Sequence, residues 1–344
     1  MTRVRTWCRA DLAGGTLDIW PLGLLHPGAR TVNVALDLAV EVRLELRSTG
    51  SAGSAGSAGS AGSGSFAVLQ GGERLEKGTL AELAASPGGA LVAAVALVED
   101  LPPCAIEIAS ASPRGGGLGA SSALAVALLA AAEVQLHGAL TRSAAERAAL
   151  ARDIEARLMG LPTGLQDHYP AQLGGVLEIA HEPGGERVTS LPVDLEGLGE
   201  HLLVGFTGQS HFSAGANWMV VRRRLEADPT IVEQLGAIAA VASRMPPALL
   251  AADWAAVGAL VGAEWAARRQ LSEEISTPAI EALLRTAREH GAWGGKACGA
   301  GGGGSVLVLA PRERHAAIAA AWQRQGTQIL AARPTARQLE VESS

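Results

Sequence analysis

A glycine-rich run near the middle of the chain has the composition of a phosphate-binding loop. Residues 113–123 read Pro-Arg-Gly-Gly-Gly-Leu-Gly-Ala-Ser-Ser-Ala, and an apolar segment rich in alanine and leucine follows directly. Glycine lets backbone N–H groups approach an anion without a Cβ in the way, and the start of a helix is electropositive. The run therefore predicts a site for nucleotide phosphates, although glycine-serine loops also serve as plain turns. The glycines concerned are Gly115, Gly116, Gly117 and Gly119.

Two further segments are centred on glycines. Residues 294–304 read Gly-Gly-Lys-Ala-Cys-Gly-Ala-Gly-Gly-Gly-Gly and precede an apolar, strand-like stretch. A glycine run of this length costs conformational entropy on folding, so it predicts close packing against a ligand or another loop. Near the N-terminus, residues 9–18 place an arginine and two aspartates around a glycine turn. Three such segments together are hard to explain as plain turns.

These three segments, in this order, resemble the three motifs of the GHMP small-molecule kinases. Residues 9–18, together with Asn33, are similar to the branch that includes heptose-phosphate, fucose and galactose kinases. The resemblance extends from about residue 9 to residue 310, apart from a low-complexity stretch at 48–65. It implies an α+β fold in two domains, which we place at residues 1–196 and 197–344. The first would resemble domain 2 of ribosomal protein S5, and the second would be ferredoxin-like.

The resemblance implies ATP and Mg²⁺ as cofactors and assigns residues to them. Phosphoryl transfer needs a cradle for the phosphates, a metal ion to neutralise charge and a group that takes the hydroxyl proton. Ser121 and Glu155 match the metal ligands, hard oxygen donors that suit Mg²⁺. An exposed Glu155 paired with Arg152 or Arg157 is the alternative. The nucleotide residues implied are Pro113, Gly115, Gly116, Gly117, Leu118, Gly119, Ala120, Ser121, Ser122, Gly299, Gly301 and Gly302.

Asp167, within Gly-Leu-Gln-Asp-His-Tyr at 164–169, matches the catalytic base of the family. A carboxylate is a weak base, and Arg9 matches a basic residue that keeps it ionised. The alternatives are a helix cap for Asp167 and an ion pair with Asp11 for Arg9.

The acceptor site is implied by fewer residues. Asp18 and Asn33 match positions that face the sugar in related kinases, and carboxylates accept hydrogen bonds from paired hydroxyls. Asp18 capping its own turn is the alternative. The substrate-binding residues expected are Gly14, Gly15, Asp18, Asn33, Thr207 and Gly208, with Ser210 and His211 as further contacts.

The expected function is therefore ATP-dependent phosphorylation of a sugar or sugar phosphate, with heptose-7-phosphate 1-kinase as the nearest named activity. Two alternatives remain open. One is a kinase of the same family acting on homoserine or mevalonate. The other is a regulator that binds nucleotide or sugar without catalysis. This alternative is disfavoured because the chain retains Asp167, Ser121 and Glu155.

Composition excludes several other classes. The 344-residue chain is 48% hydrophobic and carries a net charge of -6, which disfavours broad binding to nucleic acid. Three cysteines without paired spacing fit a reducing cytoplasm, and no secretory segment opens the chain. The apolar run at 123–134 is too short to span a bilayer and predicts a buried helix rather than a membrane segment. The expected partner is a small-molecule substrate, and the expected state is a monomer or homodimer.

Hydrophobic periodicity predicts the elements that must position these residues. Strands are expected at residues 4–11, 31–46, 202–207, 305–310 and 327–332, with a hairpin at 175–179 and near Val188. Helices are expected at residues 80–98, 121–137, 142–159, 214–227, 230–244, 248–271 and 277–290. Residues 48–65 repeat Ser-Ala-Gly, which predicts a flexible loop, whether native or introduced.

Overall fold

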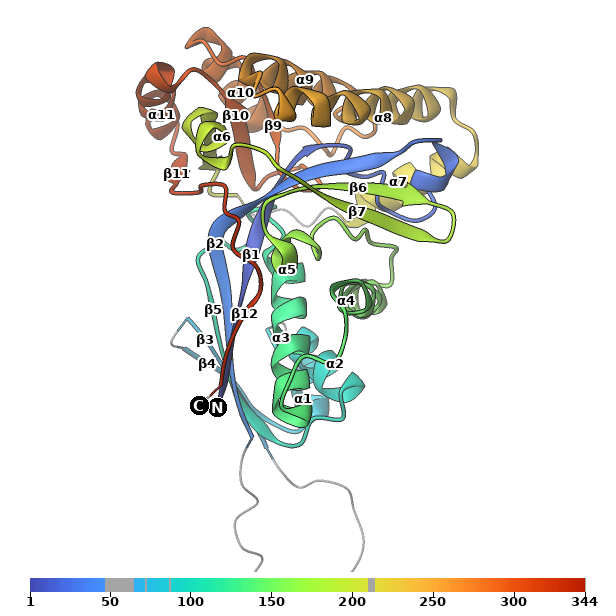
Figure 1. Ribbon diagram of the computed structural model, residues 1–344, viewed down its shortest axis with the longest axis vertical. Helices are drawn as coiled ribbons and strands as arrows, with labels where there is room; N and C mark the ends of the chain where they lie inside the picture. Colours follow the sequence, from blue (N-terminus) through green and yellow to red (C-terminus); the bar gives the residue numbers. More distant parts are fainter. Residues whose placement is uncertain (47–64, 72, 87, 210–213, 344) are drawn as a thin grey trace, which may run out of the picture.

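A computed structural model of the chain describes residues 1–46, 65–71, 73–86, 88–209 and 214–343. The low-complexity stretch, Ser210 and His211 therefore lie outside the described residues, apart from Ser65. Within the described part, the chain forms two β-sheets with helices packed on and between them (Figure 1).

The first sheet has the order β12-β1-β2-β5-β3-β4, and the hairpin β6–β7 extends it from β2. All its pairs are antiparallel except β3 with β5. The chain termini lie side by side because β12 pairs with β1 (Figure 1). Its strands are β1 (Thr2–Ala13), β2 (Arg30–Leu46), β3 (Phe66–Gln70), β4 (Glu73–Gly78), β5 (Cys104–Ser110), β6 (Val176–Glu182), β7 (Gly185–Leu191) and β12 (Glu340–Ser343).

The second sheet is antiparallel, with the order β11-β8-β10-β9. Its strands are β8 (Leu202–Phe206), β9 (Gly294–Ala297), β10 (Ser305–Leu309) and β11 (Gln328–Leu330). The two sheets thus divide on either side of Glu196, except that β12 returns to the first sheet.

The helices fall into two groups. The first group packs beside the first sheet (Figure 1). It comprises α1 (Leu80–Ala85), α2 (Ala90–Val98), α3 (Ala120–His137), α4 (Ala144–Met159) and α5 (Pro170–Leu173). The second comprises α6 (Leu195–His201), α7 (Ala214–Leu225), α8 (Pro229–Leu250), α9 (Trp254–Arg268), α10 (Pro278–Glu289) and α11 (His315–Arg324). Short 3₁₀ turns are η1 (Gly23–Leu25) and η2 (Arg312–Arg314).

The burial of β1 explains how the two halves meet. Its first residues alternate between buried and half-buried, as in a strand with one covered face, whereas Thr6–Ala13 is buried throughout. One hydrophobic core joins the two sheets at this level. It includes Leu12 on β1, Val204 on β8, Leu307 on β10 and Met245 on α8. The end of β1 that holds Arg9 and Asp11 therefore lies in the interior between the halves.

Helix α3 consists mostly of alanine, leucine and valine without a polar face, which is typical of a buried helix. The whole helix, Ala120–His137, is long and apolar enough to cross a membrane by length and composition, although the apolar run expected at 123–134 is only part of it. However, 67% of this helix is buried inside the protein, which makes α3 a core helix as expected.

The structure confirms the expected strands and the hairpin, and it changes three helices, those expected at 80–98, 230–244 and 248–271. The helix expected at 80–98 is two helices, because Ser86 ends α1 and Gly89 begins α2. The helix expected at 248–271 begins only at Trp254, since α8 continues through Pro246 and Pro247 to Leu250.

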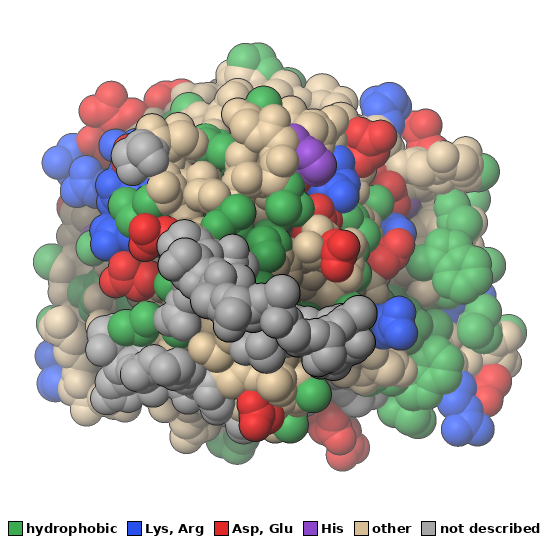
Figure 2. Space-filling view, turned by 90° about the horizontal axis from the view of Figure 1, so that it is seen from below, with side chains coloured by type: hydrophobic (Ala, Val, Ile, Leu, Met, Phe, Trp, Pro, Cys, Tyr) green, Lys and Arg blue, Asp and Glu red, His purple; other side chains and the backbone are tan. Residues whose placement is uncertain are grey.

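The surface carries charges of both signs. On the face shown in Figure 2, the described Lys and Arg side chains are interspersed with Asp and Glu rather than gathered into one stripe. This distribution agrees with the net charge of -6 and differs from the continuous basic face typical of nucleic-acid-binding proteins.

Candidate active site

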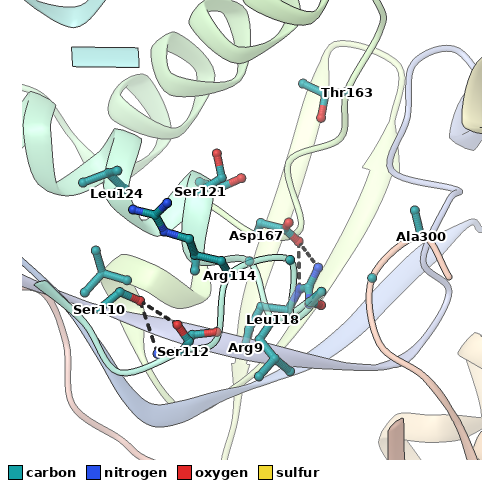
Figure 3. Close-up of a pocket in the computed structure, with 18 of the residues that line it drawn as sticks. Arg9, Ser110, Ser112, Arg114, Leu118, Ser121, Leu124, Thr163, Asp167 and Ala300 are labelled. Carbon is teal, nitrogen blue, oxygen red and sulfur yellow. Dashed lines mark hydrogen bonds and ion pairs between the residues drawn. The ribbon is translucent and has the colours of Figure 1, made fainter. Parts of the chain in front are cut away.

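A cavity of about 690 Å³ lies where the three glycine-centred segments meet. Its walls include β1, the loop before α3 and the segment after α4 (Figure 3). Arg268 at the end of α9 also lines it. Of the residues expected from the sequence, those that line it are Arg9, Asp18, Pro113, Gly115, Gly116, Gly117, Leu118, Gly119, Ala120, Ser121, Ser122, Asp167 and Gly299.

The loop between β5 and α3 has the backbone that an anion site requires. Gly115, Gly117 and Gly119 all have positive φ, a region that residues with a Cβ rarely adopt. Gly119 is the N-cap of α3 and provides no side-chain cap. The N–H groups of the first turn of α3 therefore have no capping side chain, and Ala120, Ser121 and Ser122 line the cavity. This is a suitable place for phosphate oxygens.

The third glycine run packs mainly against the second. A Cβ on Gly117 would lie 2.6 Å from the carbonyl oxygen of Cys298, and one on Gly304 would lie 2.9 Å from that of Gly115. The Ser305 N–H also donates to the Gly116 carbonyl at 2.9 Å. The glycines are thus needed so that two backbones can touch. Of the expected nucleotide contacts in this run, Gly299 borders the cavity.

Gly301 and Gly302 differ from the expectation. A Cβ on Gly301 would lie 2.3 Å from the carbonyl oxygen of Ile275, and the Gly302 N–H donates to that same oxygen at 2.8 Å. Neither residue lines the cavity. Their close packing fixes the loop that presents Gly299.

Arg9 and Asp167 form an ion pair under the glycine loop (Figure 3). The guanidinium Nε and Nη2 lie 2.7 Å and 2.6 Å from Asp167 Oδ1, and Nη1 donates to the Gly117 carbonyl. The Arg9 side chain is 3% exposed and that of Asp167 is 26% exposed. Arg9 therefore pairs with Asp167 and not with Asp11, and it ties the carboxylate to the phosphate loop. Such a carboxylate, open to the cavity on one side, can accept a proton from a bound hydroxyl.

Glu155 is buried on α4 and does not pair with Arg152 or Arg157. Its two carboxylate oxygens accept hydrogen bonds from Ser121 Oγ at 2.8 Å and Ser122 Oγ at 2.7 Å, and His168 Nε2 lies 2.8 Å from one of them. Burial raises the pKa of Glu155, but the hydrogen bonds from His168 and the serines outweigh it, so the pKa lies below its ordinary value.

This cluster contains the donors that Mg²⁺ prefers, a carboxylate and hydroxyl oxygens beside the phosphate loop. Ser121 lines the cavity, whereas Glu155 lies one layer behind it. Among the described residues, no group of three or more His, Cys, Asp and Glu side chains makes an all-protein metal site. The chemistry of the donors fits an ion that is held partly by phosphate and water.

Asp18 lines the cavity beside Gly164 and Gln166. Its carboxylate accepts hydrogen bonds from the N–H of Gln166 at 3.2 Å and from the Gln166 side-chain amide at 3.3 Å. Burial and the charge of Asp167 raise the pKa of Asp18 to about 6. Asp18 therefore does not simply cap its own turn, and it faces the cavity beside Asp167.

The remaining acceptor residues lie behind the wall or beside it. Asn33 is fully buried, does not line the cavity, and donates from Nδ2 to the Gln166 carbonyl at 3.0 Å. A Cβ on Gly14 would lie 2.0 Å from the Arg30 carbonyl oxygen, and one on Gly15 would lie 2.1 Å from Arg268 Nη2. These three residues therefore support the wall and do not reach the space where a substrate would lie.

Thr207 and Gly208 lie at the end of β8, outside the cavity lining. Thr207 Oγ1 donates to the Gly304 carbonyl at 2.8 Å, and a Cβ on Gly208 would meet nothing within 4 Å. In this structure Thr207 holds the third glycine run, and the neighbouring Ser210 and His211 lie outside the described residues.

Sequence reasoning missed a buried ion cluster next to the cavity. Asp11 on β1 pairs with Arg268 at 2.8 Å and with Lys296 at 2.9 Å, and Glu264 pairs with the same two cations at 2.7 Å and 2.8 Å. All four side chains are at most 2% exposed. Arg268 also donates to the Gly299 carbonyl and lines the cavity. One signal was available, since Lys296 is one of two lysines in the chain.

Other polar residues that line the cavity were also not expected. They are Thr16, Gln70, Ser110, Ser112, Arg114, Thr163, Gln166 and Asn217. Most lie in loops or at element ends, where no periodic pattern marks them.

Two segments of the chain match the models of the two domains of one protein family. Residues 89–175 match the GHMP kinases N terminal domain, and residues 245–328 match GHMP kinases C terminal.

Individual proteins are similar over longer stretches. A D-glycero-alpha-D-manno-heptose 7-phosphate kinase of Campylobacter jejuni is 29% identical over 220 residues, which span 62% of this chain and 63% of that enzyme. A mevalonate kinase of Thermococcus sibiricus is 30% identical over 243 residues, 69% of this chain and 68% of that enzyme. The crystal structure of a D-glycero-D-manno-heptose 1-phosphate kinase from Bacteroides thetaiotaomicron has the same fold, with a TM-score of 0.76 over 100% of this chain and 99% of that one at 20% identity.

These relatives are named kinases, and the structural likeness over 100% of this chain includes both sheets and all three glycine-centred segments. The cavity where those segments meet contains a paired carboxylate, a glycine loop and hydroxyl donors in one place. The chain belongs to the GHMP kinase family.

Proposed function

We propose that the chain transfers the γ-phosphoryl group of ATP to a hydroxyl of a sugar or sugar phosphate. A heptose 7-phosphate phosphorylated at its 1-hydroxyl is the leading acceptor, because a heptose 7-phosphate kinase is among the relatives. The observation that supports transfer chemistry best is the Arg9–Asp167 pair, which lies against Gly117 and Gly119 of the phosphate loop.

The nucleotide phosphates would bind along the loop from Gly115 to Gly119 and the first turn of α3. Backbone N–H groups and the helix dipole favour anions there. Within the part of the chain that the structure describes, Arg114 lines the same stretch without an acidic partner. It adds positive charge to the phosphate side of the cavity.

Ser121 and Glu155 would hold Mg²⁺, with Ser122 beside them. When bound, the ion neutralises charge on the β- and γ-phosphates. Glu155 is already ionised in place, because its hydrogen bonds with His168 and the two serines lower its pKa. A carboxylate that need not lose a proton is ready to accept a cation.

Asp167 would orient the acceptor hydroxyl and take its proton. The buried Arg9 guanidinium pairs with this carboxylate and ties it to the glycine loop through the Gly117 carbonyl. Asp18, which also lines the cavity, would accept hydrogen bonds from other hydroxyls of the acceptor. The two carboxylates thus divide the work of deprotonation and binding.

Residues 1–196 and 197–344 would act as two domains with the substrates held between them. The first provides the phosphate loop, Asp167 and Asp18. The second provides Gly299 and Arg268 at the rim of the same cavity.

A non-sugar alcohol is the second candidate acceptor, because a mevalonate kinase is among the relatives. A regulator without catalysis is the third, and it would bind nucleotide without consuming it. A screen of ADP release distinguishes these candidates. It would use hexoses, heptoses, their phosphates, mevalonate and homoserine, each with ATP and Mg²⁺.

With the best acceptor, Asp167→Asn should lower kcat by about 10²–10⁴-fold, because the amide keeps the shape but cannot take the proton. Asp153→Asn is the matched control, since Asp153 is an exposed acid on α4. Turnover near wild type in Asp167→Asn would refute the base assignment. Turnover of mevalonate or homoserine alone would refute the sugar acceptor, and ATP binding without turnover would favour the regulator.

A further inference from the structure

Gln166 lies between the two carboxylates of the cavity. It precedes Asp167 in the chain, and it donates to Asp18 twice. Its backbone N–H lies 3.2 Å from Asp18 Oδ2, and its Nε2 lies 3.3 Å from Oδ1. One residue therefore contacts both oxygens of the carboxylate. Gln166 is itself only 9% exposed, although it lines the cavity.

Two neighbours fix Gln166 and Asp18 in this arrangement. The fully buried Asn33 on β2 donates to the Gln166 carbonyl at 3.0 Å. Gly164 leaves the space that Asp18 occupies, because a Cβ there would lie 1.6 Å from Asp18 Oδ2. The segment 164–169 that contains Asp167 therefore also fixes the direction of the Asp18 side chain, through Gly164 and through Gln166, which Asn33 holds in place.

The charges around Asp18 make such support necessary. Asp167 and Asp11 both oppose its ionisation, and Arg268 on α9 is the cation that interacts with it through space. Arg268 is hydrogen-bonded to Asp11, Glu264 and Gly299 instead. Among the described residues, Asp18 has no ion-pair partner, so neutral amide groups are what hold its carboxylate.

An amide donor differs from an arginine in its effect on the charge and the lone pairs of the carboxylate. It orients the carboxylate without cancelling its charge, so the remaining lone pairs can accept hydrogen bonds from hydroxyls. The Gln166 Oε1 has no hydrogen-bond partner in the described structure. If Asp18 takes up a proton, rotation of the amide presents this oxygen to the new O–H. Glutamine is therefore compatible with both forms of Asp18, which neither Glu nor Lys would be.

We infer that Gln166 is a positioning residue that orients Asp18 toward the acceptor and sets the pH range in which Asp18 can bind it. Asn33 fixes Gln166 from behind. The inference rests on the proposed function, in which Asp18 binds acceptor hydroxyls. Because Gln166 acts through Asp18, its role should concern the acceptor and not the nucleotide.

Kinetics of Gln166→Met and Gln166→Glu test this role. Gln166→Met removes the side-chain donor, and the KM of the acceptor should rise about 10–100-fold while that of ATP changes less than about twofold. Gln166→Glu places a third carboxylate beside Asp18, so the acidic limb of kcat/KM for the acceptor should move to higher pH by about one unit. Gln323→Glu, the same change at an exposed position of α11, should alter neither.

Gly164→Ala is a second variant in case the Gln166 variants fold poorly. Its methyl group displaces the Asp18 carboxylate and leaves Gln166 intact, so the acceptor KM should again rise without a matching rise for ATP. Equal changes in both KM values, or unchanged acceptor KM and pH profile in folded variants, would overturn the inference.

A measurement without turnover separates this inference from the proposed function. The difference in unfolding free energy between wild type and Asp18→Asn, measured as a function of pH, reports the titration of Asp18. The same difference is then measured between Gln166→Glu and the double variant Gln166→Glu with Asp18→Asn. Its midpoint should lie at higher pH by about one unit. An unshifted midpoint refutes the positioning role even if wild type phosphorylates a sugar. A shifted midpoint supports it even if no sugar is turned over.

Discussion

Asp11 and Asp18 lie on the same N-terminal segment, yet the folded protein moves their pKa values in opposite directions. Burial raises the pKa of Asp11, but Lys296 and Arg268 outweigh it and lower the pKa below its ordinary value. The pKa of Asp18 is raised to about 6 by burial and by the charge of Asp167. The residue type is the same, and the difference lies in what the rest of the chain brings against it.

The ion cluster around Asp11 is closed. Two carboxylates, Asp11 and Glu264, face two cations, Arg268 and Lys296, and all are buried. The cluster joins β1 of the first sheet to α9 and β9 of the second, and through Arg268 it fixes the Gly299 carbonyl at the cavity. Because its positive and negative charges are equal in number, the cluster stabilises one arrangement of the two halves. It has no net charge that a ligand would neutralise.

The cavity around Asp18 is open and unbalanced. Asp167 has one cation, Arg9, and Asp18 has amide donors alone among the described residues. Unneutralised charge in a half-buried site costs stability, and groups of this kind are common where a protein binds or reacts. The neutralised charges around Asp11 are therefore typical of a structural cluster, and the unneutralised charge of Asp18 is typical of a functional site.

The largest expected effect is on the closed cluster. Lys296→Met removes one cation and leaves Asp11 and Glu264 with a single partner in a buried place. We expect the free energy of unfolding to fall by about 3–5 kcal/mol, measured by urea denaturation at pH 7.5. Arg187→Met is the control, because Arg187 and Glu182 form an exposed pair, and it should cost less than about 1 kcal/mol. Equal losses in the two variants would contradict the distinction.

A smaller effect should follow when the balance of the cluster is restored. The double variant Asp11→Asn with Lys296→Met removes one charge of each sign and leaves the Arg268–Glu264 pair intact. Coupling between the two changes should recover about 1–3 kcal/mol of the loss seen in Lys296→Met, in the same denaturation experiment. Additive losses would mean that the packing of Lys296, and not its charge, stabilises the cluster.

The smallest effect should have the opposite sign. Because the folded pKa of Asp18 is raised to about 6, its contribution to stability is present below pH 4 and is lost as the pH rises through 6. Asp18→Asn avoids that loss. Its unfolding free energy should exceed that of wild type by about 1–2 kcal/mol at pH 7.5 and match it near pH 4.

The same variant tests function as well as stability. Asp18→Asn should bind the acceptor more weakly even though it is more stable, a trade-off common at functional sites. Thermal unfolding across pH 4–8, run beside acceptor kinetics, measures both. A variant that is less stable at pH 7.5 would contradict the cost that we assign to the ionised carboxylate.

Elements with strong periodicity were predictable from the sequence. The strands at β1 and β2 and the helices α3 and α4 begin and end within a few residues of the expected limits. The helix expected to stop at Arg244 continues to Leu250, because Met245 and Leu249 are buried in the core that joins the sheets. Packing there outweighs the two prolines, a contribution that local propensity does not contain.

Partners distant in sequence were not predictable without the fold. Nearby arginines on the same helix offered Glu155 an ordinary surface pair, yet its oxygens accept from Ser121 and Ser122 on α3. For Arg9, the neighbour Asp11 was as plausible as the distant Asp167. Sequence spacing restricts only local pairs, and both of these contacts depend on how helices and strands pack.

The sequence by itself determined the residues that can do the chemistry and the backbones that can approach closely. Glycines at the two loops permit positive φ and contact without a Cβ, and these are local properties of residue type. The tertiary structure decided which charges meet. It placed Asp11 against two cations and Asp18 against Asp167 and Gln166, because a pKa depends on neighbours and burial that other segments provide.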